Sequence, residues 1–145
     1  MSKYKIELHA HSAESSRCGS IKAEEVVKKY YKAGYNALVM TDHYYARFFD
    51  KIADLSWDKQ LEKYLKGYKT AKKAAKNLDF KVFLGIEIKF INDPNEYLVY
   101  GLSSKFLGEN PIINEMSINE ESDYNEPQGQ PMTEESDIKK EDKSK

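Results

Sequence analysis

Hydrophobic positions in the first two thirds of the chain follow two spacings, one typical of strands and one typical of helices. Residues 5–9 and 36–41 predict strands, and the middle of the second is apolar throughout, as in a parallel strand covered on both faces. Apolar residues recur at helical spacing over residues 23–33, which predicts a helix with a poorly capped start. Gly34 suits the left-handed conformation that ends a helix.

The same spacing predicts one long helix over residues 56–77, with Ser56 as its cap and lysines on its polar side. Two further strands are expected at residues 81–90 and 96–102. The turn signal Asn92-Asp-Pro-Asn95 between them favours an antiparallel hairpin. The order is therefore β, α, β, α, β, β, which indicates an α/β architecture whose ligand sites lie at the carboxyl ends of the parallel strands.

Composition changes near residue 117. Residues 117–145 hold nine acidic side chains against four lysines and few large apolar residues, whereas residues 1–116 carry a net charge of +4. A segment of this composition buries too little surface to offset the entropy of ordering it. We therefore expect a folded domain at 1–116 and a disordered polar tail at 117–145. The alternative for the tail is an acidic interaction segment.

Whole-chain properties exclude some classes of protein. The longest apolar stretches are a handful of residues, far short of the roughly 20 that span a bilayer, so no membrane association is expected. The charged start does not resemble a secretory signal, and the single cysteine, Cys18, cannot form an intrachain disulfide. A cytoplasmic location is the resulting expectation.

The chain has three histidines, and all fall at predicted strand ends. His9 and His11 are two residues apart, so in an extended chain they project to the same side. His43 ends Thr41-Asp-His43 after the second strand, and Glu87 is the carboxylate of an otherwise apolar strand. Imidazole and carboxylate together suit zinc, manganese or iron, and a carboxylate can bridge two ions.

Each of these residues also has a simpler interpretation. A His-x-His pair is often a surface or capping feature, and Glu87 alone could pair with Lys89 across a strand edge. Asp42 could orient His43 or cap the next turn, and Cys18 is expected to be a small buried residue. The convergence of the candidates at equivalent strand ends favours metal binding.

These segments together resemble a known family. The segments Ile6-Glu-Leu-His-Ala-His-Ser12, Cys18-Gly-Ser-Ile21 and Val39-Met-Thr-Asp-His43, followed by Gly85-Ile-Glu-Ile88 and Tyr97-Leu-Val-Tyr-Gly-Leu102, are similar to the PHP domain, the polymerase and histidinol phosphatase family. The resemblance covers about residues 4 to 118. It implies a distorted β/α barrel of seven units, a site of two or three metal ions and the hydrolysis of phosphate esters.

By this resemblance, His9 and His11 are metal ligands and Glu87 bridges two ions. His43 ligates a further ion or contacts phosphate, and Glu87 and His43 are the residues expected to take part in catalysis. The implied fold is a partial, TIM-like β/α barrel with about three parallel strands plus a hairpin. The implied substrate is a phosphorylated small molecule or a nucleotide.

Part of the family pattern is missing. Family members carry further histidines and a late D-x-H pair, but no histidine follows His43 here, and Glu14 lies near a position that often holds a ligand. A complete eight-unit β/α barrel takes about 250 residues, so the expected sheet has an open edge that could support self-association. The family-like sequence stops near Ile118, as in a truncated or frameshifted gene or an evolved short form.

Two functions therefore compete. The first is a divalent-metal phosphoesterase, impaired because ligands are absent; the second is a noncatalytic remnant that binds metal or phosphate, or serves as a protein-interaction module. Nucleic-acid binding by the basic body is a third interpretation. Its lysines lie mostly on predicted helix faces, however, where solvated charge is the usual explanation.

Overall fold

The computed structural model describes residues 3–111 and 113, so the expected disordered tail at 117–145 lies outside the described residues. The elements alternate between strands and helices, in the order expected from the sequence with three additions. They are β1 (Ile6–Ala10), α1 (Ala23–Lys32), β2 (Ala37–Met40), β3 (His43–Tyr44), α2 (Ala46–Asp50), α3 (Trp57–Tyr64), α4 (Lys66–Ala75), β4 (Lys81–Ile88), β5 (Tyr97–Tyr100) and α5 (Ser104–Glu109).

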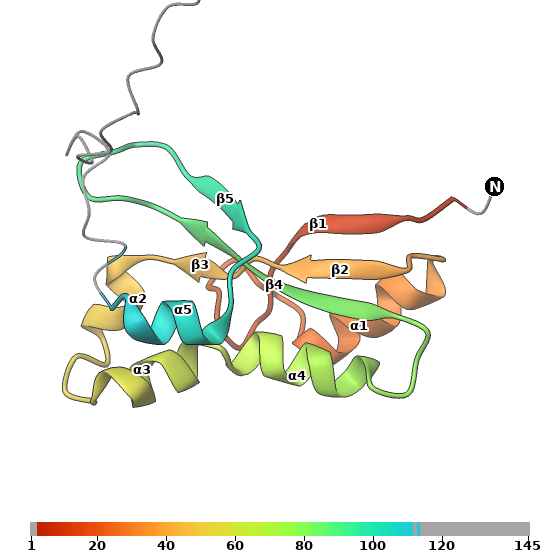
Figure 1. Ribbon diagram of the computed structural model, residues 1–145, viewed down its shortest axis with the longest axis horizontal. Helices are drawn as coiled ribbons and strands as arrows, with labels where there is room; N and C mark the ends of the chain where they lie inside the picture. The colour runs from red at the N-terminus through yellow and green to blue at the C-terminus, as the bar shows by residue number, and fades with distance from the viewer. Residues whose placement is uncertain (1–2, 112, 114–145) are drawn as a thin grey trace, which may run out of the picture.

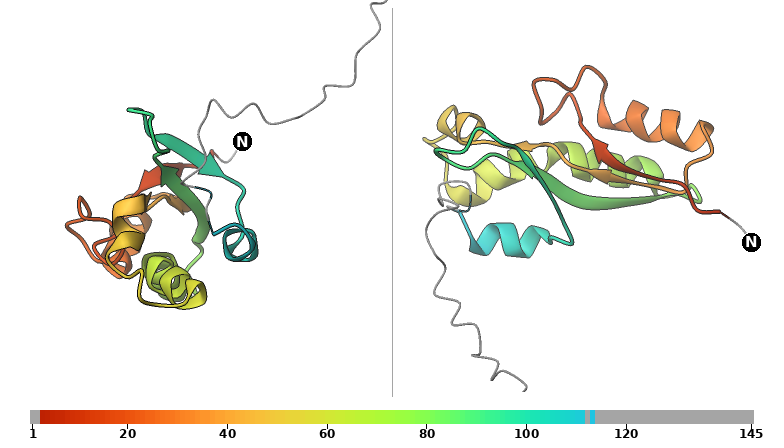
Figure 2. Two further views of the ribbon diagram at one scale, coloured as in Figure 1. Left: turned by 90° about the vertical axis from the view of Figure 1, so that its left-hand side faces the viewer. Right: turned by 90° about the horizontal axis from the view of Figure 1, so that it is seen from above.

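The strands form a curled, mostly parallel sheet in the order β1-β2-β4-β3, which Figures 1 and 2 show from three sides. β1 and β4 both pair with β2 in parallel, and β3 pairs with β4 in parallel. β5 pairs with β4 in antiparallel orientation, which confirms the expected hairpin. The fold is a partial barrel, as expected, with the two-residue β3 as an additional parallel strand.

Helices cover one face of this sheet (Figure 1). α1 and α4 pack on each other and against β2 and β4, and the buried side chains of this part form one core cluster around Val27, Leu38 and Ala71. A second core cluster lies under β3 and the carboxyl-terminal half of β4 and includes Tyr44 and Tyr64. β2 is buried along its whole length, as expected of a central parallel strand.

The expected long helix over residues 56–77 is wrong, because the chain breaks into α3 and α4 at Leu65. The Ser15 hydroxyl lies at this break, donating to the Tyr64 carbonyl at 2.6 Å and accepting from the Gly67 amide at 3.2 Å. A side chain that inserts into the backbone ladder in this way is a known cause of helix kinks. The partner of the break lies 50 residues away in sequence, so helical spacing alone could not reveal it.

Three short elements were not expected: β3, α2 and α5. Each is shorter than the window over which a hydrophobic period can be recognised. Gly34 ends α1 in the left-handed region, with a φ of 79°, as expected. No helix among the described residues is both long enough and apolar enough to cross a membrane.

Candidate metal centre

The two histidines of the His-x-His pair project from the carboxyl end of β1. His9 lies in β1 and His11 directly follows the strand, and their Nε2 atoms are 2.7 Å apart. His9 is exposed, whereas only 17% of the His11 side chain is accessible. The structure therefore places both imidazoles on the same side, as the spacing of two residues predicts.

Glu87 and His43 come from β4 and β3, where they are direct partners in the parallel register. The Oε2 atom of Glu87 is 3.0 Å from Nδ1 of His43, 3.2 Å from Nε2 of His11 and 3.3 Å from Nε2 of His9. The four candidate residues thus meet at one carboxylate oxygen. Among the described residues, Glu87 forms ion-pair contacts with these histidines and not with Lys89.

The spacing of these atoms is close to that around a bound ion. Two ligand atoms that each lie about 2.1 Å from one tetrahedral ion are about 3.4 Å apart. The contacts of Glu87 with His9 and His11 have nearly this spacing. The 2.7 Å between the imidazoles of His9 and His11 is shorter, so His9, the more exposed side chain, has to shift by less than about 1 Å to share an ion.

The protonation of His11 favours metal binding at neutral pH. Partial burial, together with the nearby His43 and His9, lowers the pKa of His11 to about 4. A neutral imidazole offers the lone pair that a metal ion needs. Nδ1 of His11 lies 3.3 Å from the Ser16 hydroxyl, a contact that orients the ring.

Asp42 is buried beside this cluster and organises the loop after β1. Its carboxylate accepts hydrogen bonds from the Ser12 amide, the Ser12 hydroxyl and the Ser16 hydroxyl, each 2.7 Å long. The Ser16 hydroxyl in turn accepts from the His43 amide at 3.0 Å. Asp42 therefore acts on His43 through Ser16 and the loop rather than by direct contact with the imidazole. Burial raises the pKa of the Asp42 carboxyl, and the bonds from Ser12 and Ser16 oppose this shift.

The first turn of α4 packs directly against this network. A Cβ atom on Gly67 would collide with the Ser12 hydroxyl and the Asp42 carboxylate, so glycine is required there. Tyr64 is fully buried, and its hydroxyl donates to the Asp42 carbonyl at 2.6 Å. The helix break at Leu65 thus brings the helices into contact with the strand ends.

The expectation that Cys18 is buried is wrong. Cys18 is exposed, and its Sγ lies 2.9 Å from Nε2 of His43. Partial desolvation raises the pKa of the thiol, and the Glu87 and Asp42 carboxylates also raise it. Potential ligand atoms of His11, Cys18 and His43 lie within 4.8 Å of one another, so Cys18 can extend the ligand set.

Several residues of the site were not singled out from the sequence. The hydroxyls of Ser12 and Ser16 donate hydrogen bonds to Asp42. The sequence feature that could have indicated this role is a cluster of short polar residues directly after the His-x-His pair. Potential ligand atoms of Glu96, His43 and Glu87 lie within 4.8 Å of one another. No sequence pattern indicated Glu96 as a site residue, because it precedes β5 in an exposed connection. Glu14, considered as a substitute ligand, instead accepts a hydrogen bond from the Ala23 amide at the start of α1.

The chain is similar to proteins of one family. Residues 7–140 match the model of the PHP domain. A two-domain protein from Bacteroides vulgatus that contains a predicted PHP-like metal-dependent phosphoesterase has a similar fold, with a TM-score of 0.51 and 21% identity over 69% of this chain. A protein from Bifidobacterium adolescentis assigned as a metal-dependent phosphoesterase has a TM-score of 0.43 and 18% identity over 66% of this chain. No curated protein matches. The chain spans about a quarter of each neighbour, 26% in both cases.

Proposed function

The chain belongs to the PHP domain family, and on this premise we propose that it binds divalent metal ions and hydrolyses phosphate esters with metal-activated water. One observation carries the proposal: three imidazoles from two strand ends surround a single oxygen of Glu87. Histidine nitrogens and a buried carboxylate are the donor set of zinc, manganese and iron sites. In this proposal His9, His11 and Glu87 are ligands of the first ion.

A bound divalent ion supplies a water of lowered pKa and positive charge opposite the phosphoryl oxygens. Oε2 of Glu87 lies near both His11 and His43, which supports the proposal that this carboxylate bridges two ions. His43 faces Glu87 with Nδ1 and Cys18 with Nε2 and is proposed to hold a further ion or to contact phosphate. His11 is neutral at pH 7 and so is ready to bind without first losing a proton.

The proposed activity is weaker than that of a longer family member. The described residues supply three histidines to the centre, and the sequence has no histidine after His43. Fewer ligands leave the ions less firmly held and more hydrated, which reduces the preorganisation on which phosphoryl transfer depends. Phosphorylated small molecules or nucleotides remain the proposed substrates, and the cytoplasm remains the proposed location.

A second candidate function is noncatalytic binding of metal or phosphate. The partial ligand set favours it, because an ion held by His9, His11 and Glu87 alone can be retained without a second ion for catalysis. The two candidates share the metal site and differ only in turnover. A single set of variants therefore separates them.

The test measures metal content and hydrolysis on the same samples. The chain is stripped with a chelator, reloaded with manganese or zinc, dialysed and assayed for bound metal and for hydrolysis of an aryl phosphate. We expect bound metal in the parent and at least a tenfold weaker affinity in Glu87→Gln and His11→Ala, roughly the smallest loss expected when a ligand is removed. Glu62→Gln, an exposed position on α3, is the matched control and is expected to behave as the parent.

The outcomes assign the function. Turnover that depends on metal and disappears in both site variants supports the phosphoesterase, and we expect a rate well below that of a longer family member. Retained metal without turnover assigns the noncatalytic function. If the parent retains no more metal than Glu87→Gln and His11→Ala, the metal centre itself is refuted.

A further inference from the structure

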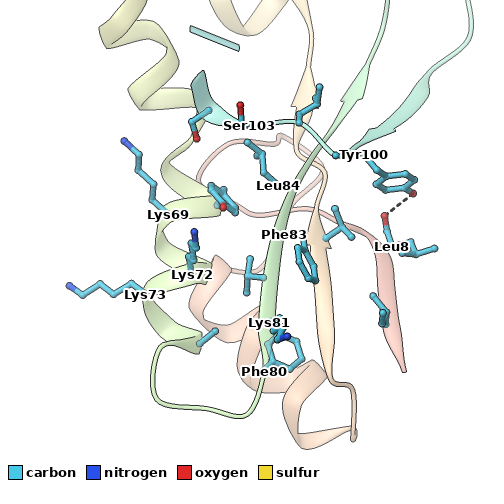
Figure 3. A pocket seen from close by; sticks show the side chains of 18 of the residues that line it. Leu8, Lys69, Lys72, Lys73, Phe80, Lys81, Phe83, Leu84, Tyr100 and Ser103 are labelled. Atoms are coloured by element: carbon cyan, nitrogen blue, oxygen red, sulfur yellow. Dashed lines mark hydrogen bonds between the residues drawn. The ribbon is translucent and has the colours of Figure 1, made fainter. Parts of the chain in front are cut away.

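A large apolar groove lies along β4, away from the candidate metal centre. It has a volume of about 1420 Å³ and is bounded by β1, β4, α4 and the segment from β5 to α5 (Figure 3). Leu8, Phe83 and Tyr100 line it and are 53%, 48% and 44% exposed. The Tyr100 hydroxyl donates to the Leu8 carbonyl at 3.0 Å and links the two sides of the groove. Apolar side chains of this size are usually covered in a folded protein.

The groove follows a strand edge that has no partner among the described residues. Residues 81–84 of β4 pair with β2 on one side. β3 continues this edge in the same register. On the other side, β5 pairs with β4 only from Gly85 onwards. An open edge of this kind can accept an added strand, with affinity from the backbone and specificity from alternate side chains.

Lysines surround the groove. Lys69, Lys72 and Lys73 extend from α4 along one side of it, as Figure 3 shows, and Lys81 lies on β4. None of these lysines forms an ion pair with a described residue. Residues 57–81 as a whole carry eight lysines against three acidic residues. The occupant of the groove should therefore be acidic as well as partly apolar.

We propose that residues 118–126 of the same chain add to the open edge of β4 as a strand. This segment, Ile118-Asn-Glu-Glu-Ser-Asp-Tyr-Asn-Glu126, has four acidic residues and no lysine. In a strand, Ile118 and Tyr124 share one face with Glu120, Ser122 and Glu126, and Glu121 and Asp123 lie on the other face. Ile118 and Tyr124 then cover Phe83 and Leu8, and Glu121 and Asp123 lie against the lysines of α4.

The segment follows the part of the chain that borders the groove and lies within the family match. Ser104 at the start of α5 lines the groove, and the described chain continues to Ile113. The match to the PHP domain extends to residue 140 and so includes this segment. Attachment to the same chain gives the segment an effective concentration on the order of millimolar.

A second copy of the chain fits the groove less well. Two copies that paired through this edge would place the lysines of α4 and β4 opposite one another, and like charges disfavour the contact. A second acidic segment also fits less well. Residues 134–137 repeat the tetrapeptide Glu-Glu-Ser-Asp of residues 120–123, but Lys139 and Lys140 follow it directly. This repeat provides a matched control.

The experiment measures hydrogen exchange of the Val82 and Leu84 amides in the full chain, because the Lys81 amide already donates to the Asn36 carbonyl on the β2 side and successive amides alternate between the two edges. We compare the parent with Glu121→Lys/Asp123→Lys and with the control Glu135→Lys/Asp137→Lys, which changes the same residue types and the same charge. We expect exchange to be about tenfold faster in the first variant and unchanged in the control. Amides of β2 serve as an internal check of global folding, since this strand is fully buried.

Two further measurements make the test decisive. Combining Glu121→Lys/Asp123→Lys with Lys72→Glu/Lys73→Glu should restore slow exchange, because the charges are then exchanged between the two sides. Salt at about 0.5 M should speed exchange in the parent. Equal exchange in the parent and in Glu121→Lys/Asp123→Lys overturns the proposal. An equal effect of Glu121→Lys/Asp123→Lys and Glu135→Lys/Asp137→Lys also overturns it. Protection that rises with protein concentration also overturns it and assigns the groove to a second copy.

Discussion

At the carboxyl end of the sheet, the buried Asp42 carboxylate finds its partners within the described chain, whereas the amino-terminal half of β4 leaves apolar side chains uncovered by any described residue. Asp42 is 3% exposed and accepts three hydrogen bonds from Ser12 and Ser16. Phe83 on β4 is 48% exposed, although its neighbour Leu84 is only 7% exposed. The two regions belong to one sheet, yet the described residues complete the network around Asp42 and leave this part of β4 without a covering layer.

The difference shows which part of a barrel the described residues build by themselves. The strand ends are joined by hydrogen bonds between neighbouring loops and by the turn between α3 and α4, all of which lie within the described residues. The concave face instead needs side chains from the opposite side of a closed barrel. The described part of the barrel can therefore hold a preorganised cluster at its carboxyl end without a covering layer from its own residues along the amino-terminal half of β4.

The largest expected effect comes from removing the buried carboxylate. Asp42→Ala leaves the Ser12 amide and the hydroxyls of Ser12 and Ser16 without their acceptor in a site from which water is excluded. Each buried unsatisfied group costs about 1–3 kcal/mol, so we expect the free energy of unfolding to fall by about 4 kcal/mol. Urea denaturation followed by circular dichroism measures the change.

Asp79→Ala is the control for the loss of a carboxylate, because Asp79 is exposed in the loop before β4. We expect it to change stability by less than about 0.5 kcal/mol. If Asp42→Ala and Asp79→Ala have the same stability, the network at the strand ends does not stabilise the fold as its geometry indicates.

The sequence predicted the parts of this fold that depend on local pattern. The main strands, α1 and the hairpin were predicted because hydrophobic period and turn residues determine them within about ten residues. The break at Leu65 was missed because it depends on Ser15, and the exposure of Cys18 was missed because loop packing determines it. Such contacts between distant residues leave no periodic signal.

The second effect separates the groove from the core under the helices. Ile86→Ala removes a fully buried side chain from the cluster that includes Leu61 and Leu107, and we expect a loss of about 3 kcal/mol in any background. If residues 118–126 cover the groove, Phe83→Ala should cost about 1 kcal/mol more in the parent than in Glu121→Lys/Asp123→Lys. Urea denaturation of the four combinations gives the coupling energy.

The result distinguishes an open groove from a covered one. A cost of Phe83→Ala that is the same in both backgrounds means that the acidic segment does not reach Phe83. A coupling that appears for Ile86→Ala instead of Phe83→Ala means that Glu121→Lys/Asp123→Lys acts on the core under the helices and not on the groove.

The candidate site was predictable to a similar extent. His9, His11, His43 and Glu87 were placed together from their positions at strand ends, and the structure brings their donor atoms within 3.3 Å of the Glu87 carboxylate. Asp42 was considered as a direct partner of His43, but it acts through Ser16. Strand order can predict which residues meet, whereas the orientation of a buried carboxylate depends on which donors the loops provide.

The smallest expected effect is a pH dependence of stability from His11. Its pKa is about 4 in the folded chain and about 6.5 when unfolded. Between these values the unfolded chain binds more protons, so stability falls as the pH decreases from about 6.5 to about 4. One proton changes the free energy of unfolding by at most about 1.4 kcal/mol per pH unit, and the partial accessibility of His11 reduces this.

The measurement compares the melting temperature of metal-free parent and His11→Gln between pH 6.5 and pH 4. The raised pKa of Asp42 acts in the opposite direction, because a carboxyl that is protonated more readily when folded gains stability as the pH falls. Asp42 is present in both proteins, so the difference between their slopes isolates His11. We expect the parent to lose more stability on acidification than His11→Gln. Equal slopes would mean that the imidazole is solvated as in the unfolded chain, and that the strand ends hold it less tightly than the buried network around Asp42.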